Sequence, residues 1–226
     1  RFVCGKPLIS YTIEVAMKAQ HLLYRTIVST DFLESLYTIG NEIPLEIHKF
    51  ASGKQYATWI IPPQWDVIKA ELRDDDNVIA SYEHHPLFLA PYSKSFTGWV
   101  TCDELIEHVS WKQEVPDHYF YEHRVAMDFK RRLNECRISI PYSLKPKLNS
   151  SKYFVDIQVD TKPGNMLVGT STIAGKYDYT FAFLAHLDHP GQANDGLSGV
   201  AVGTELIKRI QEALPEPNYS YQLMVV

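Results

Sequence analysis

Residues 185–199 constrain the fold more than any other stretch, because they join a predicted buried strand to a predicted helix through a loop rich in metal-binding side chains. The apolar run 179–185 has the length and composition of a strand. After the loop, Val200, Leu206 and Ile210 recur at helical spacing. The loop is therefore expected at the carboxyl end of a strand, where open α/β sheets bind ligands.

Two histidines and two aspartates lie in the first part of this stretch and at its turn into the helix. Imidazole nitrogens and carboxylate oxygens are good zinc ligands. We predict that His186, His189 and Asp195 bind metal, and that the two oxygens of Asp195 can bridge two cations about 3.5 Å apart, as two-metal hydrolases require. Asp188 is predicted to hydrogen-bond the far nitrogen of a ligating imidazole and so to fix its tautomer.

The small residues of the loop are expected to let the backbone turn tightly and the helix start pack against its strand: Gly191, Ala193, Gly196, Ser198 and Gly199. A simpler interpretation remains open. Asn194–Gly196 has the composition of an ordinary turn, and Asp195 is a residue type that often caps helices.

Several landmarks occur in one order along the chain, namely Pro44–His48, Trp59–Trp65, Gly98–Val100, Tyr153–Asp156, His189–Pro190, Ala193–Asp195 and Leu197–Gly199. With them, residues 31–226 resemble the aminopeptidase-like proteins related to the co-catalytic zinc aminopeptidases. The resemblance is to the branch that carries an inserted β domain and is often found among polysaccharide-biosynthesis genes. That branch uses the His-Pro histidine and the Asn-Asp aspartate, which implies His189 and Asp195. The broader aminopeptidases use the His-x-Asp position, which implies His186.

The resemblance implies an α/β fold, a zinc-aminopeptidase-like mixed sheet with flanking helices, incomplete here, plus a small inserted mainly-β domain. We expect residues 31–52 and 110–226 to form the aminopeptidase-like domain and residues 53–109 to form the insertion. Within 53–109, short apolar segments separated by turn residues predict strands at 59–61, 67–72, 78–82 and 87–90. A helix with capping-box spacing at its start is predicted over 101–109.

Outside the insertion, the patterns predict helices over 32–39 and 119–133 and strands over 45–47, 137–140, 154–159, 166–173 and 219–226. Lys162–Asn165 has the composition of a hairpin turn. His84 and His85 are adjacent in a predicted strand region, so their side chains would point to opposite faces, which argues against a shared metal.

The first 30 residues resemble a different family. Gly5–Glu14 and Arg25–Asp31 are similar to the start of sugar-nucleotide cytidylyltransferases of the acylneuraminate type. Such enzymes also carry a basic nucleotide-binding loop and magnesium-binding acids, which this sequence does not show. We interpret residues 1–30 as a fragment without nucleotidyl-transfer capacity that makes few contacts with the core. A plain helix-strand lead-in to the following domain is the alternative.

Composition narrows the class of partners. The chain has 226 residues, is 45% hydrophobic and carries a formal net charge of -5, so it offers no basic stripe for a nucleic acid. No segment is apolar and long enough to span a membrane and no signal peptide opens the chain, so we expect a cytoplasmic protein. Three separated cysteines, Cys4, Cys102 and Cys136, are expected to be thiols.

These observations together predict a truncated zinc aminopeptidase-like hydrolase. Its substrate is expected to be a peptide or amide, cleaved by a two-metal site in the full-length form, and the resemblance implies a link to polysaccharide biosynthesis. In the resembling family the general base and further ligands follow the strand at 219–226, so we expect them beyond Val226, with zinc weakly held or absent in this chain. One alternative is a non-catalytic glycan- or protein-binding module on a peptidase-like scaffold. A second is a cytidylyltransferase-related protein. The oligomeric state stays open.

Overall fold

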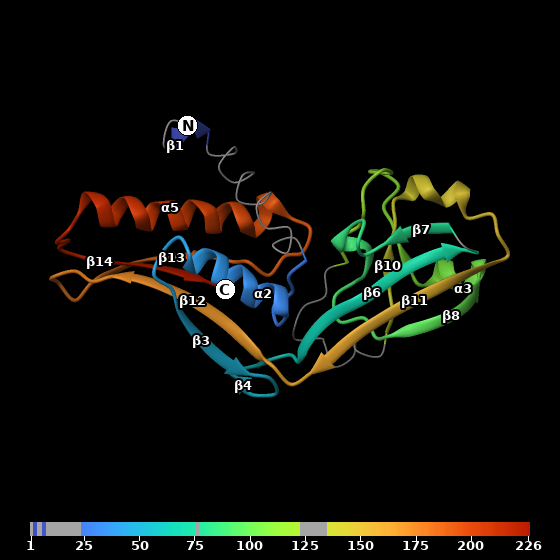
Figure 1. Ribbon diagram of the computed structural model, residues 1–226, viewed down its shortest axis with the longest axis horizontal. Helices are drawn as coiled ribbons and strands as arrows, with labels where there is room; N and C mark the ends of the chain where they lie inside the picture. The colour runs from blue at the N-terminus through green and yellow to red at the C-terminus, as the bar shows by residue number, and fades with distance from the viewer. Residues whose placement is uncertain (1, 4–5, 8–23, 76, 123–134) are drawn as a thin grey trace. The chain divides into compact units, whose positions relative to one another are not determined.

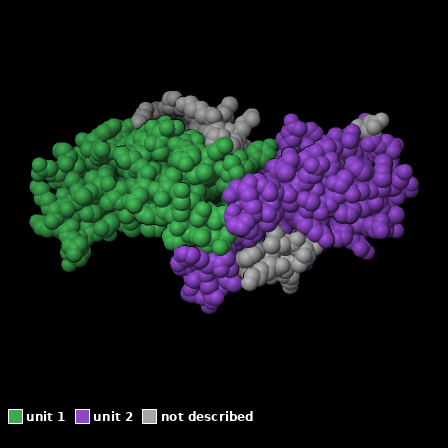
Figure 2. Space-filling model, turned by 60° about the horizontal axis from the view of Figure 1, so that its bottom comes forward, with its two compact units in different colours: residues 1–52, 164–226 green, residues 53–163 purple. Residues whose placement is uncertain are grey.

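The computed structural model describes residues 2–3, 6–7, 24–75, 77–122 and 135–226. The chain divides into two compact units, unit 1 (residues 1–52 and 164–226) and unit 2 (residues 53–163), which Figure 2 shows in green and purple. The first boundary lies where the sequence placed the start of the insertion. The second lies at 163 rather than at 109.

Unit 1 is built on a four-stranded mixed sheet in the order β13-β14-β12-β3 (Figure 1). The strands are β3 (Glu46–Ala51), β12 (Asn165–Ile173), β13 (Thr180–Ala185) and β14 (Ser220–Val225). β13 runs parallel to β14, whereas β12 runs antiparallel to both β14 and β3. A separate short pair joins β1 (Phe2–Val3) to β2 (Lys6–Pro7). The mixed sheet with flanking helices confirms the predicted fold class.

Helices α2 (Thr30–Gly40) and α5 (Ser198–Ala213) supply the apolar side chains that cover this sheet. Both helices have buried residues at helical spacing, such as Phe32 and Leu36 on α2 and Val200 and Ile207 on α5. These side chains share one core with Leu223 of β14. Burial of an apolar stripe from each helix against the sheet is the main favourable term in such a fold.

The segment before α2 belongs to unit 1, which corrects the expectation for the end of residues 1–30. Arg25, Thr26, Val28 and Ser29 are buried. The Ser29 hydroxyl accepts a hydrogen bond from the backbone N–H of Phe32 at 3.2 Å and so caps α2. Leu8, Ile9 and Ile13, which were expected to stay off the core, lie outside the described residues.

Unit 2 contains an antiparallel four-stranded sheet in the order β7-β6-β11-β8. Its strands are β6 (Gln64–Asp74), β7 (Asn77–Ser81), β8 (Phe96–Thr101) and β11 (Lys152–Lys162). The remaining elements are β4 (Gln55–Tyr56), β5 (Trp59–Ile60), η2 (Pro86–Phe88), α3 (Cys102–Glu107), β9 (Val109–Ser110), β10 (Ile138–Ser139) and η4 (Tyr142–Lys147). Three of the four predicted strands of the insertion and its capped helix are confirmed.

The fourth predicted strand, at 87–90, is largely the single helical turn η2. Pro86 occupies the first turn of η2, and its fixed φ suits a helix start. The predicted helix over 119–133 is not helical at residues 119–122, and its remainder lies outside the described residues.

Strand β11 explains why unit 2 extends to residue 163. It pairs with β6 on one side and with β8 on the other, which ties the chain before it to the sheet of residues 53–109. The next strand, β12, belongs to the other sheet. Lys162–Asn165 is therefore the passage between units, and the predicted hairpin turn is wrong.

Two further expectations concern membrane-spanning segments and the cysteines. None of the described helices has both the length and the apolarity of a membrane-spanning segment. Cys102 and Cys136 are thiols, whereas Cys4 lies outside the described residues.

Candidate metal centre

The loop after β13 carries the predicted cluster at the carboxyl end of that strand, as the sequence indicated. It leads into the irregular turn η5 (Ala193–Leu197) and then into α5. Gly196 adopts a φ of 95°, which interrupts the helical backbone. A Cβ atom at this position would lie 3.1 Å from the carbonyl oxygen of His186, so glycine lets the turn close over the first histidine.

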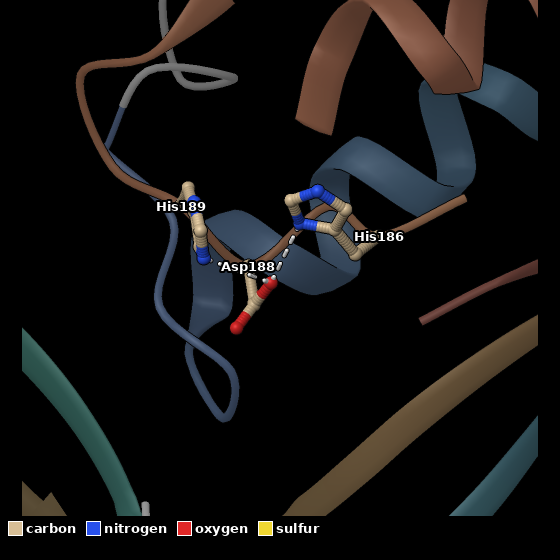
Figure 3. A group of neighbouring side chains, drawn as sticks. All are labelled: His186, Asp188 and His189. Atoms are coloured by element: carbon tan, nitrogen blue, oxygen red, sulfur yellow. Dashed lines mark hydrogen bonds and ion pairs between the residues drawn. The ribbon is translucent and has the colours of Figure 1, made fainter. Parts of the chain in front are cut away.

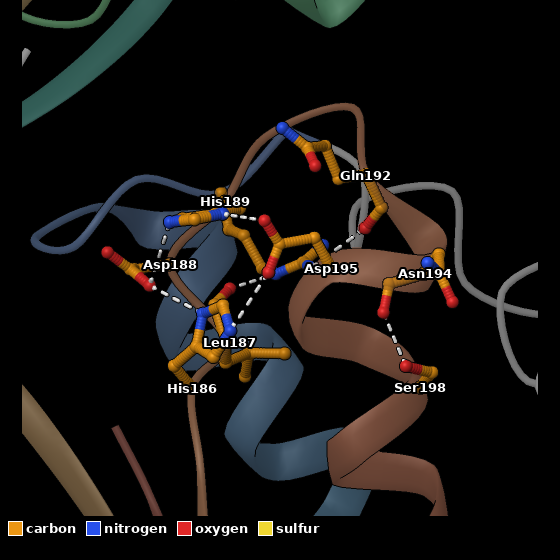
Figure 4. A network of polar contacts seen from close by, with 9 residues as sticks. His186, Leu187, Asp188, His189, Gln192, Asn194, Asp195 and Ser198 are labelled. Atoms are coloured by element: carbon orange, nitrogen blue, oxygen red, sulfur yellow. Dashed lines mark hydrogen bonds and ion pairs between the residues drawn. The ribbon is translucent and has the colours of Figure 1, made fainter. Parts of the chain in front are cut away.

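The three predicted ligands converge around the carboxylate of Asp195 (Figure 4). Its Oδ1 atom lies 3.0 Å from Nε2 of His186, and its Oδ2 atom lies 3.1 Å from Nδ1 of His189. Each oxygen thus faces a different imidazole, an arrangement that suits a bridging carboxylate. Asp195 does not cap α5, because the residue before that helix is Leu197 and no side chain caps it.

Asp188 lies on the other nitrogen of His186 (Figure 3). Its Oδ1 atom is 3.3 Å from Nδ1 of His186 and 3.9 Å from Nε2 of His189. A carboxylate on Nδ1 holds the proton there and leaves the lone pair of Nε2 for a metal ion. This contact is the one expected of an orienting residue.

The donor atoms also fit within the reach of one ion. One ligand atom each from His186, Asp188 and His189 lies within 4.8 Å of the others, which makes them the one such group of three among the described residues. Asp195 is absent from that group, although it contacts both histidines. Asp195 is the better candidate ligand, because it contacts both imidazoles, whereas Asp188 already occupies Nδ1 of His186.

The cluster is open to solvent on one side and backed by a buried cation on the other. The side chains of His186 and Asp195 are 43% and 50% exposed, so an ion or substrate can reach them. Arg25 is fully buried, and burial lowers its pKa to about 10, although the nearby charge of Asp188 opposes this shift. Arg25 is therefore still protonated at neutral pH.

Arg25 is the residue of this region that the sequence analysis did not single out, because it was placed in the fragment 1–30. Its signal in the sequence is a cation at the start of the otherwise uncharged run Arg25–Thr30. A buried charge needs partners, and these partners lie far along the chain.

His84 and His85 do not form a metal pair in the described structure. Nδ1 of His85 accepts a hydrogen bond from the N–H of Leu87 at 3.1 Å, and the ring stacks on Tyr119 at a centroid distance of 4.2 Å. His84 is exposed.

A mixed α/β sheet with flanking helices is also the fold of known aminopeptidase-like proteins. A crystal structure named for a peptidase from Clostridium acetobutylicum matches 97% of this chain with a TM-score of 0.81 and 21% identity, and 51% of that chain is covered. The zinc aminopeptidase BSAP from Bacillus subtilis matches 96% of this chain with a TM-score of 0.58 and 10% identity, with 60% of that chain covered. This protein therefore has an aminopeptidase-like fold.

The sequence comparisons define the family more narrowly. The profile described as "Domain of unknown function (DUF4910)" matches residues 16–226, so the chain belongs to the DUF4910 family. A C. acetobutylicum protein named for polysaccharide biosynthesis and an aminopeptidase-like domain is 24% identical over 201 residues, which cover 88% of this chain and 44% of that protein. The chain thus spans about half the length of the relatives it matches. The family model covers residues 16–30 together with the rest of the chain. These residues therefore do not belong to a separate fragment 1–30, as the sequence suggested.

Proposed function

We propose that this chain is the metal-binding part of a zinc-dependent hydrolase that cleaves a peptide or amide bond. The observation that carries the proposal is the carboxylate of Asp195, whose two oxygens face two imidazoles at 3.0 and 3.1 Å. The zinc aminopeptidase fold of a solved relative supports the choice of metal, and the name of the curated relative supports a link to polysaccharide biosynthesis.

The residues of the cluster suit zinc by their chemistry. Imidazole nitrogen and carboxylate oxygen are its common ligands, and Asp195 with His186 or His189 would hold the ion. Bound zinc polarises a substrate carbonyl and lowers the pKa of water. Asp188 on Nδ1 favours the tautomer of His186 with its proton there, which would leave the lone pair of Nε2, on the side of Asp195, for the ion. The exposure of the cluster leaves a side from which a substrate can approach.

A hydrolase also needs a general base within hydrogen-bond reach of the attacking water. Glu205 of α5 is buried and accepts a hydrogen bond from Nε of Arg209 at 2.8 Å. This ion pair gives Glu205 a structural role on the helix, so we do not assign the base to it. The role proposed for the cluster is to bind the metal ion and to orient the substrate on it.

Zinc titration followed by calorimetry tests the proposal. We expect the wild-type chain to bind zinc weakly, with a partial set of ligands, and the Asp195→Asn variant to bind it at least about 10-fold more weakly still, because the bridging charge is lost. Asp178→Asn is the matched control, since Asp178 is an exposed aspartate of the same unit. Equal affinity for zinc in wild type and Asp195→Asn, or no binding by wild type, would contradict the proposal.

A second candidate function rests on a cavity in unit 2. The cavity has a volume of about 530 Å³ and is lined by aromatic and apolar side chains with charged groups, among them Lys94, Phe96, Trp99, Glu104, Val155 and Ile157. Trp99 is 49% exposed, and Nζ of Lys152 lies 4.4 Å from its ring centroid. An exposed aromatic ring with polar neighbours suits the apolar face and hydroxyl groups of a sugar. We propose glycan binding by unit 2 as the alternative function.

Tryptophan fluorescence titration with a panel of oligosaccharides tests this alternative. We expect a saturable change that Trp99→Ala abolishes and that the control Trp111→Ala retains, because Trp111 packs on Tyr142 and Lys145 and does not line the cavity. A panel without any saturable change, or equal changes in both variants, would count against glycan binding.

A further inference from the structure

Arg25 connects the segment before α2 to the loop that carries the metal-binding cluster. Its Nε atom donates a hydrogen bond to the carbonyl oxygen of Leu187, and Nη2 donates to the carbonyl oxygen of Gln192 at 3.5 Å. Leu187 stands between His186 and Asp188, and Gln192 lies between His189 and the turn with Asp195. Figure 4 shows both residues in this loop.

The cost of burying this side chain makes a purely structural role a poor explanation. Arg25 has 0% of its surface exposed, and its Nη1 atom has no hydrogen-bond partner in the part of the chain that the structure describes. Taking a guanidinium out of water costs several kcal/mol in effect, and only complete hydrogen bonding offsets it. Replacing a whole set of buried charged partners by well-packed apolar side chains often leaves the stability of a fold unchanged or raises it. The stability of unit 1 therefore gives little reason for a cation here.

The geometry of the two contacts gives a better reason. Both acceptors are backbone carbonyls, one on each side of His189 in the sequence. A planar guanidinium with donors in a fixed fork can hold two carbonyls at a set separation, whereas an ammonium group is a point charge. Each loop residue left unrestrained keeps conformational entropy of about 1–2 kcal/mol that metal binding would have to remove.

We propose that Arg25 is a positioning residue that clips the two sides of the metal-binding loop together. The clip holds His186, with Asp188 on its other nitrogen, at the distance from which Asp195 on the other side of the loop can bind the same metal ion. This inference rests on the proposed metal-binding function of the cluster. It assigns to the segment before α2 a role in the metal site.

Two variants distinguish the effect of the forked guanidinium geometry of Arg25 from the effect of its positive charge. Arg25→Lys keeps the positive charge and loses the fork, and Arg25→Met loses both. Arg209→Met is the control, since Arg209 lies on α5 and pairs with Glu205 and Glu212 of the same helix. Zinc affinity by calorimetry is the first readout. We expect both Arg25 variants to bind zinc about 10- to 100-fold more weakly, as is usual when a group behind the ligands is lost, and the control to bind as wild type does.

The second readout needs no metal. Hydrogen exchange of the backbone amides in 186–197 is compared between wild type and variants, with the amides of α2 as the internal reference. We expect faster exchange in the loop of both Arg25 variants and unchanged exchange in α2. Wild-type zinc affinity in Arg25→Lys would show that charge alone suffices, and unaltered loop exchange would show that no clip exists. Either result overturns the proposal.

The two readouts also separate this proposal from the proposed function. If wild type binds no zinc, the hydrolase proposal fails, while faster loop exchange in both Arg25 variants would still support the clip. If Arg25→Met no longer unfolds cooperatively, Arg25→Lys alone decides the question, because it keeps the charge and most of the side-chain volume.

Discussion

The Oδ1 atom of Asp195 lies 3.0 Å from Nε2 of His186, although the aspartate belongs to the turn before α5 and the histidine directly follows β13. The contact closes the loop onto the end of its own strand. Because Asp188 occupies the other nitrogen of the same imidazole, His186 is held between two carboxylates. His189 faces the same two carboxylates, but only Asp195 is close to it, at 3.1 Å through the second oxygen, whereas Asp188 lies 3.9 Å away.

This difference between the two histidines leads to the first prediction. His186→Ala removes the imidazole that Asp188 orients, so we expect it to weaken zinc binding by about 100-fold or more, and His189→Ala to weaken it less. His48→Ala is the control, since His48 bonds Thr170 in the sheet at 2.8 Å. Calorimetric titration of the three variants measures the order. A larger loss in His189→Ala would reverse the assignment of the principal ligand.

The second prediction compares Gly196, in the turn η5, with Gly199, in the first turn of α5. Alanine at Gly196 would have a φ of 95° and a Cβ 3.1 Å from the carbonyl oxygen of His186, so we expect strain of about 1–3 kcal/mol and at least about 10-fold weaker zinc binding. At Gly199 the Cβ would meet Ala185 at an ordinary 3.8 Å, so the helix start does not depend on this glycine for close packing. Gly199→Ala should stabilise α5 by about 0.5–1 kcal/mol and leave zinc binding unchanged. Equal zinc affinities in the two variants would refute the prediction.

The third prediction tests whether the segment before α2 belongs to unit 1. Ser29→Ala removes a hydroxyl that accepts hydrogen bonds from the N–H groups of Thr26 and Phe32 at 3.1 and 3.2 Å. We expect a loss of about 1–2 kcal/mol in the free energy of opening of α2, measured by hydrogen exchange of its amides. Thr38→Ala is the control, because the Thr38 hydroxyl donates to the carbonyl of Glu34 inside the helix and is not at its start. An unchanged opening energy in Ser29→Ala would mean that the cap is not formed in solution.

The fourth prediction is a pH dependence in unit 2. Burial lowers the pKa of the His85 imidazole below its usual 6.5, so the unfolded chain binds this proton more readily than the folded chain. The contribution to stability is complete above pH 6.5 and is lost as the pH falls through the lower pKa of the folded state.

All four tryptophans lie at positions 59, 65, 99 and 111, so their fluorescence follows the unfolding of unit 2. We expect the free energy of unfolding to rise with pH across this window in wild type and to rise less in His85→Asn, whose side-chain oxygen is an acceptor that does not titrate. His84→Asn, at an exposed position, should keep the wild-type slope. An identical slope in His85→Asn would show that His85 does not titrate in this range.

The sequence predicted the candidate site better than it predicted the partition of the chain. His186, His189 and Asp195 lie in one contiguous loop between a strand and a helix, so the chemistry and the local structure were visible together. Arg25 was missed because its contact with Leu187 joins residues 162 positions apart, and nothing near Arg25 indicates a partner.

The boundary at 163 was missed for a similar reason. Apolar and polar residues alternate along β11 as in any other strand. The sequence of β11 therefore does not show that it pairs with β6 and β8, which lie far upstream, in the sheet of unit 2. Proline and glycine mark a turn equally well between paired strands and between strands of separate sheets. The residues of the turn 162–165 therefore could not decide between a hairpin and a passage.

The ends of unit 2 are attached to neighbouring points of unit 1. The N–H of Ser52 donates to the carbonyl of Gly164 at 2.9 Å, the N–H of Gly164 donates to the Ser52 hydroxyl at 3.0 Å, and Ala51 stands opposite Asn165 in the ladder of β3 and β12. Residues 53–163 thus occupy the tip of what would otherwise be an ordinary β-hairpin. For an unfolded insertion, closing this pair costs about 3 kcal/mol more in chain entropy than closing a short turn. Unit 2 avoids that penalty if it folds first, and the assembly of β3 with β12 then depends on a fold that shares neither their sheet nor their core.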